Sequence, residues 1–516
     1  MKLAKAMATV AGLTGLSRIA GFIRDILTAA ILGAGPLADA FFVALKLPNF
    51  FRRVTAEGAF SVAFVPLYSE KLEKEDRARA DLFASNAFMV MLSFLTVLTL
   101  LALAAMPYII DVIAPGFESG SERYEAAIEL SRITFPYLLF MSLTALLGGV
   151  LNALDRFAPF AFAPVLFNLC LIAALLLNGF FESAGHALSY GILAAGVLQL
   201  LWLYTSARRQ GFHLKIAVPR IDADMKRLFK LMGPGIIGAG VVHINLFADM
   251  IIASFLQEGS ISFLYYADRL NQLPLGVVGI AVGTALLPML SKALAADNLE
   301  EGRNLFNRAL EFCLLLALPA ALALGVIAHE LVTVLFQRGA FDAHDTQMTS
   351  MVLICYAIGL PAYIATKVFA TAHWARHDTK TPVKISIFAT LINIALCLVF
   401  IQFIGVAGIA LGTGLTGWLQ FAAYVRSLRA HPAARFDERF RRAAPRIILS
   451  SCIMAATLFV VARLLQGMIY EPGIPKYIAL AALVASGLIA YAASTHISGA
   501  FKLTDLKRYL VKRTKT

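Results

Sequence analysis

Charged side chains within long apolar stretches are the residues of this chain with the clearest capacity for chemistry. They are Arg18, Arg24, Asp25, Asp39, Lys46, Arg52, Arg53, Glu57, Asp249, Asp268, Arg269 and Lys367. Positive residues outnumber negative ones in this set, so the chain does not supply enough internal counterions. Because arginine grips phosphate oxygens through a planar, bidentate fork, we predict an anionic substrate, and a phosphate or pyrophosphate fits best.

The spacing of these charges indicates that several share a helix face. Arg18 and Asp25 are seven residues apart, and so are Asp39 and Lys46, which places each pair two turns apart on one face. Pro48 would kink or break the second helix and expose carbonyl groups that a wet cavity can solvate. Charges in membrane segments cost about 2.5–3.5 kcal/mol and usually face a bundle interior or an aqueous cavity. We therefore predict that they line one central cavity.

Another interpretation of the same charges stays open. Arg24 with Asp25, and Asp268 with Arg269, could form structural ion pairs, and Arg52 could extend to the membrane interface. These roles explain single residues, but they do not explain the surplus of positive charge across the whole set.

The elements that must position these residues are predicted to be membrane-spanning helices. Apolar residues (AVILMFWYC) make up 59% of the 516 residues and charged residues 15%, whereas soluble proteins carry about 25% charged residues. A span needs about 20 mostly apolar residues. Fourteen segments qualify: 7–33, 37–69, 82–114, 124–153, 160–181, 186–207, 227–257, 261–291, 305–336, 345–373, 383–404, 406–427, 444–466 and 474–495. Their length argues against barrel strands, so we expect an all-α polytopic membrane protein of about fourteen helices.

The basic residues indicate the orientation of these helices. They crowd every second loop, in segments 71–79, 208–230, 376–384, 426–446 and 502–515. The intervening loops are nearly free of Lys and Arg, with Arg123, Arg338 and Lys476 as the exceptions. By the positive-inside rule, both termini are predicted to face the cytoplasm. The net charge of +13 is then a topology signal, and we expect no nucleic-acid partner.

An internal repeat suggests how the helices are grouped. Residues 59–72 resemble residues 281–294, and Pro66 aligns with Pro288 at an offset of 222. This offset maps the second span onto the eighth, and an even shift preserves direction. Two six-helix bundles related by a pseudo-twofold axis along the membrane normal are therefore predicted, as in transporters. The predicted parts are an N-terminal bundle (1–221), a C-terminal bundle (222–440), two extra helices (441–498) and a basic cytoplasmic tail (499–516).

The charged segments carry a resemblance to a known family. The motifs are Arg18–Asp25, Asp39–Asn49, Arg52–Phe60, Tyr265–Leu270 and Asp378–Pro382. They resemble those of the MurJ (MviN) lipid II flippases, and the resemblance spans essentially the whole chain. It implies the fold of the multidrug/oligosaccharidyl-lipid/polysaccharide exporter superfamily, with two bundles around a cationic cavity. It also implies a transporter, not an enzyme, that moves the undecaprenyl-pyrophosphate-linked peptidoglycan precursor from the cytoplasmic to the periplasmic leaflet.

The resemblance also implies roles for particular residues. The essential arginines of the family fall on Arg18, Arg24, Arg52 and Arg269, and Asp25 would orient Arg24. Other cavity positions fall on Asp39, Lys46 and Glu57, and the two extra C-terminal helices would form a groove for the lipid tail. The implied setting is a bacterial inner membrane, with lipid II and membrane lipids as partners, a monomeric transporter, and association with cell-wall synthesis machinery.

Sodium is the one cation that the resemblance raises. Some relatives bind sodium at positions that match Asp249, Asn393 and Thr413 here, together with the Ile409 carbonyl. Cys397 replaces a carboxylate of that set, and sulfur is a poor ligand for a hard cation. Sodium coupling is therefore left open, and no cofactor is expected to be required. The membrane potential could drive the cycle instead, since one charge moving through 100 mV yields about 2.3 kcal/mol.

The same residues are compatible with other functions to different degrees. A flippase for another polyprenyl-pyrophosphate-linked glycan would use a similar cavity. A polyprenyl-phosphate-processing enzyme would need a carboxylate-rich metal motif or an activated nucleophile, usually on sizeable polar loops, and the longest loops carry neither. The glycines Gly412, Gly414 and Gly417 satisfy G-x-G-x-x-G inside an apolar span, where close helix packing is favoured over a nucleotide site.

Overall fold

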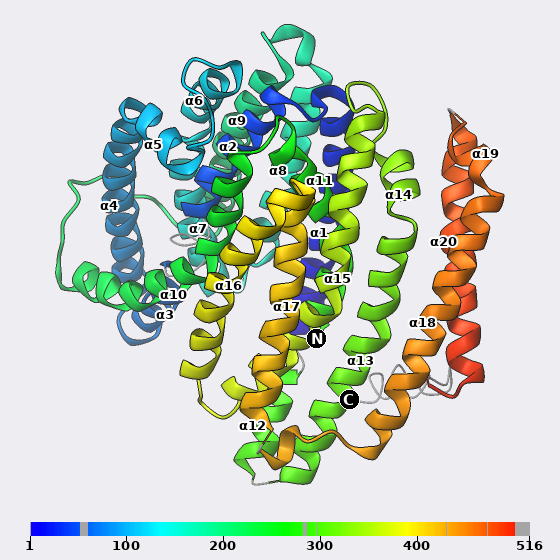
Figure 1. Cartoon of the computed structure of the whole chain (residues 1–516). Helices are drawn as coiled ribbons and strands as arrows, with labels where there is room; N and C mark the ends of the chain where they lie inside the picture. Colours follow the sequence, from blue (N-terminus) through cyan, green and yellow to red (C-terminus); the bar gives the residue numbers. More distant parts are fainter. Residues whose placement is uncertain are drawn as a thin grey trace. The chain divides into compact units, whose positions relative to one another are not determined.

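The computed structural model describes residues 2–51, 60–281, 286–296, 298–429, 431–471 and 473–500. In these ranges the chain is helical apart from short connections (Figure 1). The only strand-like pairing among them is a bridge between Arg338 and Phe341. The predicted all-α class is thus confirmed.

Each of the fourteen predicted spans coincides, where it is described, with one helix or two consecutive helices. Nine helices of the described residues are long and apolar enough to cross a membrane. The first helix carries several charges, and the second span is only partly described, so the exact number of spans stays a prediction.

Contacts divide the chain into two compact units, which are described separately. The N-terminal unit comprises Met1–Ser262 with Arg338–Phe341, and the C-terminal unit comprises Phe263–Gln337 with Asp342–Thr516. The division at residue 262 follows contacts, whereas the sequence repeat predicts a boundary at residue 221. The predicted boundaries at 221, 440 and 498 therefore stay predictions. The basic tail lies outside the described residues from residue 501 onward.

The described part of the N-terminal unit contains ten α-helices and the start of an eleventh. They are α1 (Lys2–Leu32), α2 (Pro36–Phe51), α3 (Ser61–Lys74), α4 (Arg77–Ala104), α5 (Met106–Ile113), α6 (Glu122–Thr134), α7 (Tyr137–Ala153), α8 (Ala158–Leu176), α9 (Ala184–Arg209) and α10 (Ala223–Ser254). Side-chain caps begin several of them, because Asp76, Ser121 and Ser183 accept a backbone N–H of the first turn.

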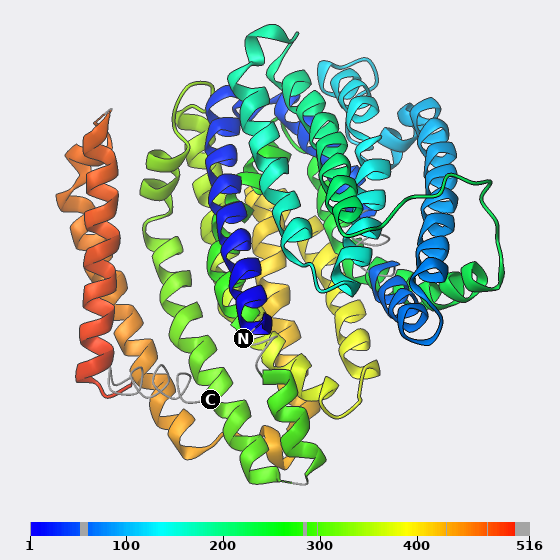
Figure 2. The ribbon, with the colours of Figure 1, turned by 180° about the vertical axis from the view of Figure 1, so that it is seen from behind.

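Packing in the N-terminal unit pairs α1 with α8, α2 with α6, and α9 with both α7 and α8. Figure 2, viewed from behind, shows α1 in dark blue along its whole length, and α8 is the helix of this unit on which it packs. Aliphatic side chains fill much of the interior, together with several aromatic rings. Phe64 stacks on Phe60 with ring centroids 5.1 Å apart and on Phe83 at 5.6 Å. The contact between Phe64 and Phe83 ties α3 to α4, and both helices also pack on α7.

The C-terminal unit continues the chain in the same manner. Its helices are α11 (Ser260–Ala281), α12 (Leu287–Ala295), α13 (Leu299–Val326), α14 (Ala328–Leu335), α15 (Ala343–Trp374), α16 (Lys380–Ile404), α17 (Ala407–Leu428), α18 (Glu438–Leu464), α19 (Gln466–Ile469) and α20 (Ile474–Ile497). Helix α17 packs on both α15 and α16, α13 packs on α15 and α18, and α18 packs on α20. The last two spans thus pair with each other and attach through α13.

Glycines set the closest helix contacts of this unit. A Cβ atom on Gly359 of α15 would lie 2.5 Å from the Gly414 Cα, and one on Gly412 would lie 2.9 Å from the Cys397 backbone N. Neither distance leaves room for a side chain. The G-x-G-x-x-G sequence of α17 is therefore a helix-packing motif, as the sequence predicted.

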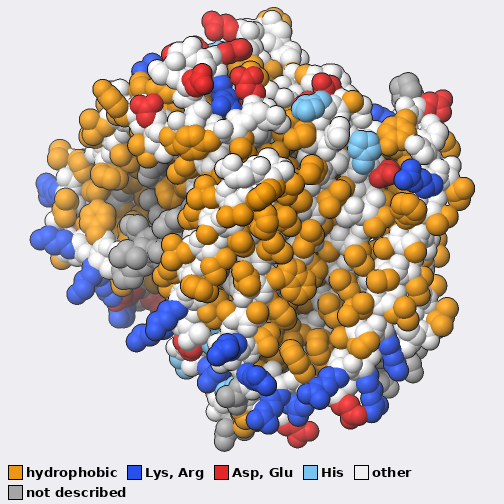
Figure 3. Space-filling model, in the orientation of Figure 1, with side chains coloured by type: hydrophobic (Ala, Val, Ile, Leu, Met, Phe, Trp, Pro, Cys, Tyr) orange, Lys and Arg blue, Asp and Glu red, His pale blue; other side chains and the backbone are white. Residues whose placement is uncertain are grey.

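The outer face of the C-terminal unit is apolar. Phe388, Leu391 and Phe403 of α16 are 61%, 62% and 79% exposed. Figure 3 shows apolar side chains covering α16 and α17, with Lys and Arg gathered at the end of α17 that leads to α18. Such a face is stable against lipid rather than water, as expected of a multi-pass membrane protein.

Candidate functional site

Arg24 is the most completely positioned of the predicted site residues. Its Nη2 and Nε atoms donate to the Asp25 Oδ1 atom at 2.7 and 3.1 Å, and its Nη1 atom donates to the Asn168 Oδ1 atom at 2.8 Å. The Asp25 residue is only 4% exposed. The predicted orientation of Arg24 by Asp25 agrees with this geometry, and so does the alternative of a structural ion pair.

Asn168 of α8 is a partner that the sequence analysis did not find. Its Nδ2 atom donates to the Ser17 carbonyl oxygen at 2.9 Å, so one amide holds both α1 and the Arg24 guanidinium. The neighbouring Phe167 ring lies 5.8 Å from the Arg24 Cζ atom. The sequence did contain a signal for this role: Asn168 is a single amide within an apolar segment. A buried polar group needs a hydrogen-bond partner, so such an amide indicates a polar contact.

Asp39 of α2 is fully buried. Its carboxylate accepts hydrogen bonds from the Gly259 N–H at 2.9 Å, the Ser262 N–H at 2.9 Å and the Ser262 hydroxyl at 2.7 Å. The Ser262 amide belongs to the first turn of α11 and the Gly259 amide immediately precedes it, and this end of a helix favours a negative charge. In this structure Asp39 therefore ties α2 to the beginning of α11.

Arg123 completes this contact from the N-terminus of α6. Its Nη1 atom lies 3.6 Å from the Asp39 Oδ2 atom, and its Nη2 atom donates to the Ser254 carbonyl oxygen at 3.1 Å. The Phe117 ring stacks 4.1 Å from the Arg123 Cζ atom. Sequence reasoning missed the role of Arg123, although a basic residue in a loop otherwise almost free of Lys and Arg was a usable signal.

The other predicted substrate-binding residues are placed less fully. Arg18 is exposed on α1, Lys46 is half-buried on α2, and Arg269 is half-buried on α11 with its Cζ atom 4.5 Å from the Tyr265 ring. Arg52 and Glu57 lie outside the described residues. Since these residues are distributed over two separate units, their convergence in one cavity stays a prediction.

The predicted sodium positions of the C-terminal unit form a neutral cluster. The Asn393 Nδ2 atom donates to the Thr413 Oγ1 atom at 3.0 Å, and the Cys397 thiol donates to the Asn393 Oδ1 atom at 3.8 Å and to the Ile409 carbonyl oxygen at 3.5 Å. The thiol thus takes up oxygens that a cation would need. Cys397 is the poorest sodium ligand of the predicted set, because its sulfur is soft and sodium is a hard cation. Asp249 is half-buried on α10 in the other unit.

Polar contacts also order the end of the C-terminal unit where Lys and Arg gather. The His373 ring joins the Asp378 Oδ2 atom at 3.0 Å and the Ser427 hydroxyl at 2.9 Å. Hydrogen bonds from the Thr381 backbone N–H and hydroxyl, with a smaller effect of His373, lower the pKa of Asp378 to about 2. Asp378 therefore stays ionised at neutral pH and holds the turn between α15 and α16.

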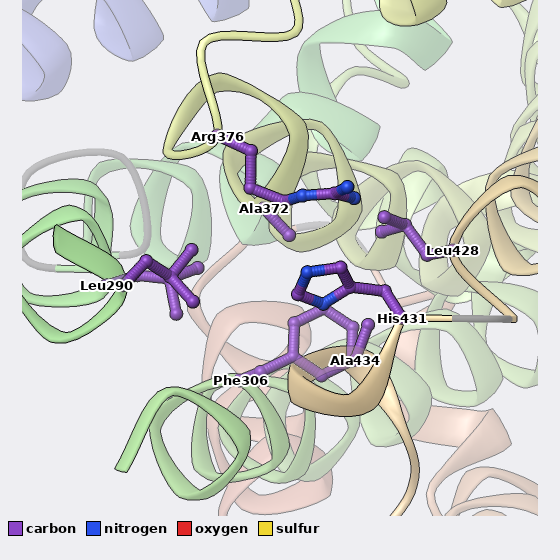
Figure 4. A pocket seen from close by; sticks show the side chains of 8 residues that line it. Leu290, Phe306, Ala372, Arg376, Leu428, His431 and Ala434 are labelled. Carbon is purple, nitrogen blue, oxygen red and sulfur yellow. The ribbon is translucent and has the colours of Figure 1, made fainter. Parts of the chain in front are cut away.

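A small pocket lies beside this turn. It is lined by Leu290, Leu294, Phe306, Ala372, Arg376, Leu428, His431 and Ala434. Figure 4 shows the Arg376 guanidinium and the His431 ring between Leu290 and Leu428. Burial, and then the nearby positive charge of Arg376 and His373, lowers the pKa of His431. Among the predicted substrate-binding residues that the structure describes, none lines this pocket.

Comparison with known proteins identifies similar chains and similar folds. A family model described as lipid II flippase MurJ matches residues 28–492. A probable lipid II flippase MurJ of Rhizobium meliloti (strain 1021) is 39% identical over 521 residues, covering 100% of this chain and 96% of that protein. A solved structure of lipid II flippase MurJ in an inward closed conformation is 28% identical, with a TM-score of 0.79 over 95% of this chain and 98% of that chain. An inward-facing MATE family transporter of the MOP superfamily shares the fold at 16% identity, with a TM-score of 0.67 over 82% of this chain and 94% of that chain.

Proposed function

Since the chain belongs to the lipid II flippase MurJ family, we propose that it moves lipid II from the cytoplasmic to the periplasmic leaflet of the bacterial inner membrane. The observation that carries the proposal is the family match over residues 28–492. The exposed apolar face of α16 and the charges kept inside α1 and α2 support it, because a flippase needs a polar path within an apolar scaffold.

The pyrophosphate of lipid II is proposed to bind the arginines. Asp25 and Asn168 hold the Arg24 guanidinium in one orientation, so little side-chain entropy is lost when an anion arrives. A pyrophosphate oxygen can replace the Asp25 oxygen, because both are oxyanions that accept from the same N–H groups. Arg18, Arg52 and Arg269, with Lys46 and Glu57, are proposed to complete the binding set.

Alternating access is proposed to proceed through the buried Asp39 contact. Opening the periplasmic ends of α2 and α11 must break the three hydrogen bonds that Asp39 accepts. Hydrogen bonds to a charged group contribute about 1.5–3 kcal/mol each, so separating α2 from the start of α11 would cost that energy, and substrate binding would offset part of it. The polyprenyl tail would stay in lipid beside the paired helices α18 and α20.

The driving force is proposed to be the membrane potential rather than a sodium gradient. Cys397 stands where the sodium-binding relatives have a carboxylate, and sulfur is a poor ligand for a hard cation, whereas the charged helices α1 and α2 can move with the field. The basic loops support cytoplasmic termini. We further propose that the protein works as a monomer beside cell-wall synthesis enzymes. It leaves lipid II chemically unaltered.

Complementation of cells depleted of their own lipid II flippase tests this proposal. The wild-type chain should restore growth, Arg24→Ala should not, and Arg209→Ala is the matched control because Arg209 is an exposed arginine at the end of α9. All three must reach the membrane in equal amounts. Normal growth with Arg24→Ala would reject the assigned role of Arg24.

A second experiment separates a flippase from an enzyme. Purified full-length protein in vesicles is incubated with labelled lipid II, and both the leaflet position and the chemical structure of the lipid are measured. Relocated, unaltered lipid II supports the proposal. An altered product would show an enzyme, and relocation of other polyprenyl-pyrophosphate glycans at the same rate would show a flippase without preference for lipid II.

A further inference from the structure

Three potential metal ligands meet at one end of the N-terminal unit. Glu129 lies on α6, Glu182 lies just before α9, and His186 lies in the first turn of α9. One ligand atom from each lies within 4.8 Å of the other two. No other group of this kind was found among the described residues. The loop charges place this end on the periplasmic side.

Two distances in this cluster, from His186 to each glutamate, are close to those of a tetrahedral transition-metal site. The His186 Nε2 atom lies 3.3 Å from the Glu129 Oε1 atom and 3.7 Å from the Glu182 Oε2 atom. Zinc binds nitrogen and oxygen ligands at about 2.0–2.2 Å in tetrahedral geometry, which puts neighbouring ligand atoms about 3.3–3.6 Å apart. The three side chains can therefore close on one ion with small movements.

The His186 ring is held in the orientation that metal binding requires. Its Nδ1 atom pairs with the Ser183 hydroxyl at 2.8 Å. Its Nε2 atom is buried and faces the Glu129 and Glu182 carboxylate oxygens. A metal-ligating histidine typically uses one ring nitrogen for the ion while a second group fixes the other. Ser183 supplies that second group and also caps α9 through the His186 N–H.

We propose that Glu129, Glu182 and His186 form a binding site for Zn²⁺ on the periplasmic face of the N-terminal unit. The imidazole nitrogen favours zinc over calcium or magnesium, which prefer six or more oxygen ligands. The glutamate side chains are 59% and 82% exposed, so they can adjust to the ion, and water can fill the fourth position. A bound ion would tie α6 to the start of α9 and stabilise this unit, independently of lipid transport.

Zinc titration of the purified full-length protein tests the site. After chelator treatment, ZnCl₂ is added while heat of binding and thermal unfolding are recorded for the wild type and for His186→Ala. The wild type is expected to bind one more equivalent of Zn²⁺ than the variant and to unfold at a higher temperature in its presence. His213→Ala, which removes an exposed histidine at the other end of α9, should behave as the wild type. Equal stoichiometry and equal thermal shifts in the wild type and His186→Ala would overturn the proposal.

Two further variants keep the test independent of folding defects. Glu129→Gln combined with Glu182→Gln preserves side-chain size and should abolish the extra equivalent, whereas Ser183→Ala should weaken zinc binding by roughly tenfold through loss of ring orientation. Co²⁺ in the wild type should give the strong d–d absorption of a tetrahedral site, and the double variant should not. Stabilisation by Ca²⁺ or Mg²⁺ but not by Zn²⁺, or unchanged zinc binding in the double variant, would refute the assignment.

Discussion

The buried polar clusters of the two units differ in charge. In the N-terminal unit, Arg24 with Asp25 and Asp39 with Arg123 keep ionised groups inside the helices. In the C-terminal unit, the Asn393, Cys397 and Thr413 side chains are themselves neutral, and the ion pairs of Arg308 with Glu311 and Asp437 lie where α13 meets the start of α18. The contrast indicates that charge is kept within α1 and α2 of the N-terminal unit at a cost, whereas the polar contact between α16 and α17 fixes helix positions.

Asp39→Ala should give the largest effect. The substitution leaves Arg123 without its buried carboxylate and the N–H groups of Gly259 and Ser262, at the start of α11, without their acceptor. Breaking a buried ion pair costs about 3–5 kcal/mol, and the loss should appear in thermal unfolding of the purified protein. Asp39→Asn keeps the size and one acceptor, so it should lose less. If Asp39→Ala were as stable as the wild type, the buried charge of the N-terminal unit would contribute nothing to stability, and the difference drawn between the two units would be wrong.

Cys397→Asp should convert the neutral cluster into a charged one. A carboxylate within a membrane segment costs about 2.5–3.5 kcal/mol, so the variant should be destabilised in choline chloride and rescued by sodium chloride. The wild type should unfold at the same temperature in both salts. Cys397→Ser is the control, because it stays neutral and similar in size. A sodium-dependent stability of the wild type would contradict the proposed independence from sodium.

Asn168→Ala should have an intermediate effect. It removes one acceptor from Arg24 and one donor to the Ser17 carbonyl, each within hydrogen-bond distance, and a buried group left unsatisfied costs about 1–3 kcal/mol. Complementation should weaken without the complete loss expected for Arg24→Ala. Asn178→Ala is a suitable control, since Asn178 follows α8 in a short surface turn. If Asn168→Ala complemented fully even at low expression, Arg24 would not need the Asn168 side chain to orient it.

Asp378→Asn should give the smallest effect. The depressed pKa of Asp378, about 2 against an ordinary value of 3.8, means that its stabilisation is present above about pH 4 and disappears as the pH falls through about 2. The exposed setting limits the difference to about 1 kcal/mol or less. Thermal unfolding of both chains at pH 7 and near pH 3 should show a gap that narrows on acidification. If the difference in unfolding temperature between the two chains widened at low pH, a contact other than the ionised Asp378 would stabilise the turn.

Local features of this sequence could be predicted, and long-range partners could not. Long apolar runs predict the helices, and the adjacency of Arg24 and Asp25 predicts their contact. Asn168, by contrast, is 144 residues from Arg24, and the partner Ser262 is 223 residues from Asp39. Nothing in helical periodicity selects such partners, because tertiary packing decides which buried polar groups meet. Cys397 shows the same limit: its thiol contacts follow from how α16 lies against α17.

The glycines of α17 have a consequence for how this protein can change over time. Gly412 faces the backbone of α16 and Gly414 faces Gly359 of α15, so one short segment of α17 packs closely against both α15 and α16. Any enlargement at either position displaces a whole helix rather than a single side chain. Substitutions there are expected to persist only when a compensating reduction arises on the facing helix, so these positions should co-vary in pairs or remain fixed.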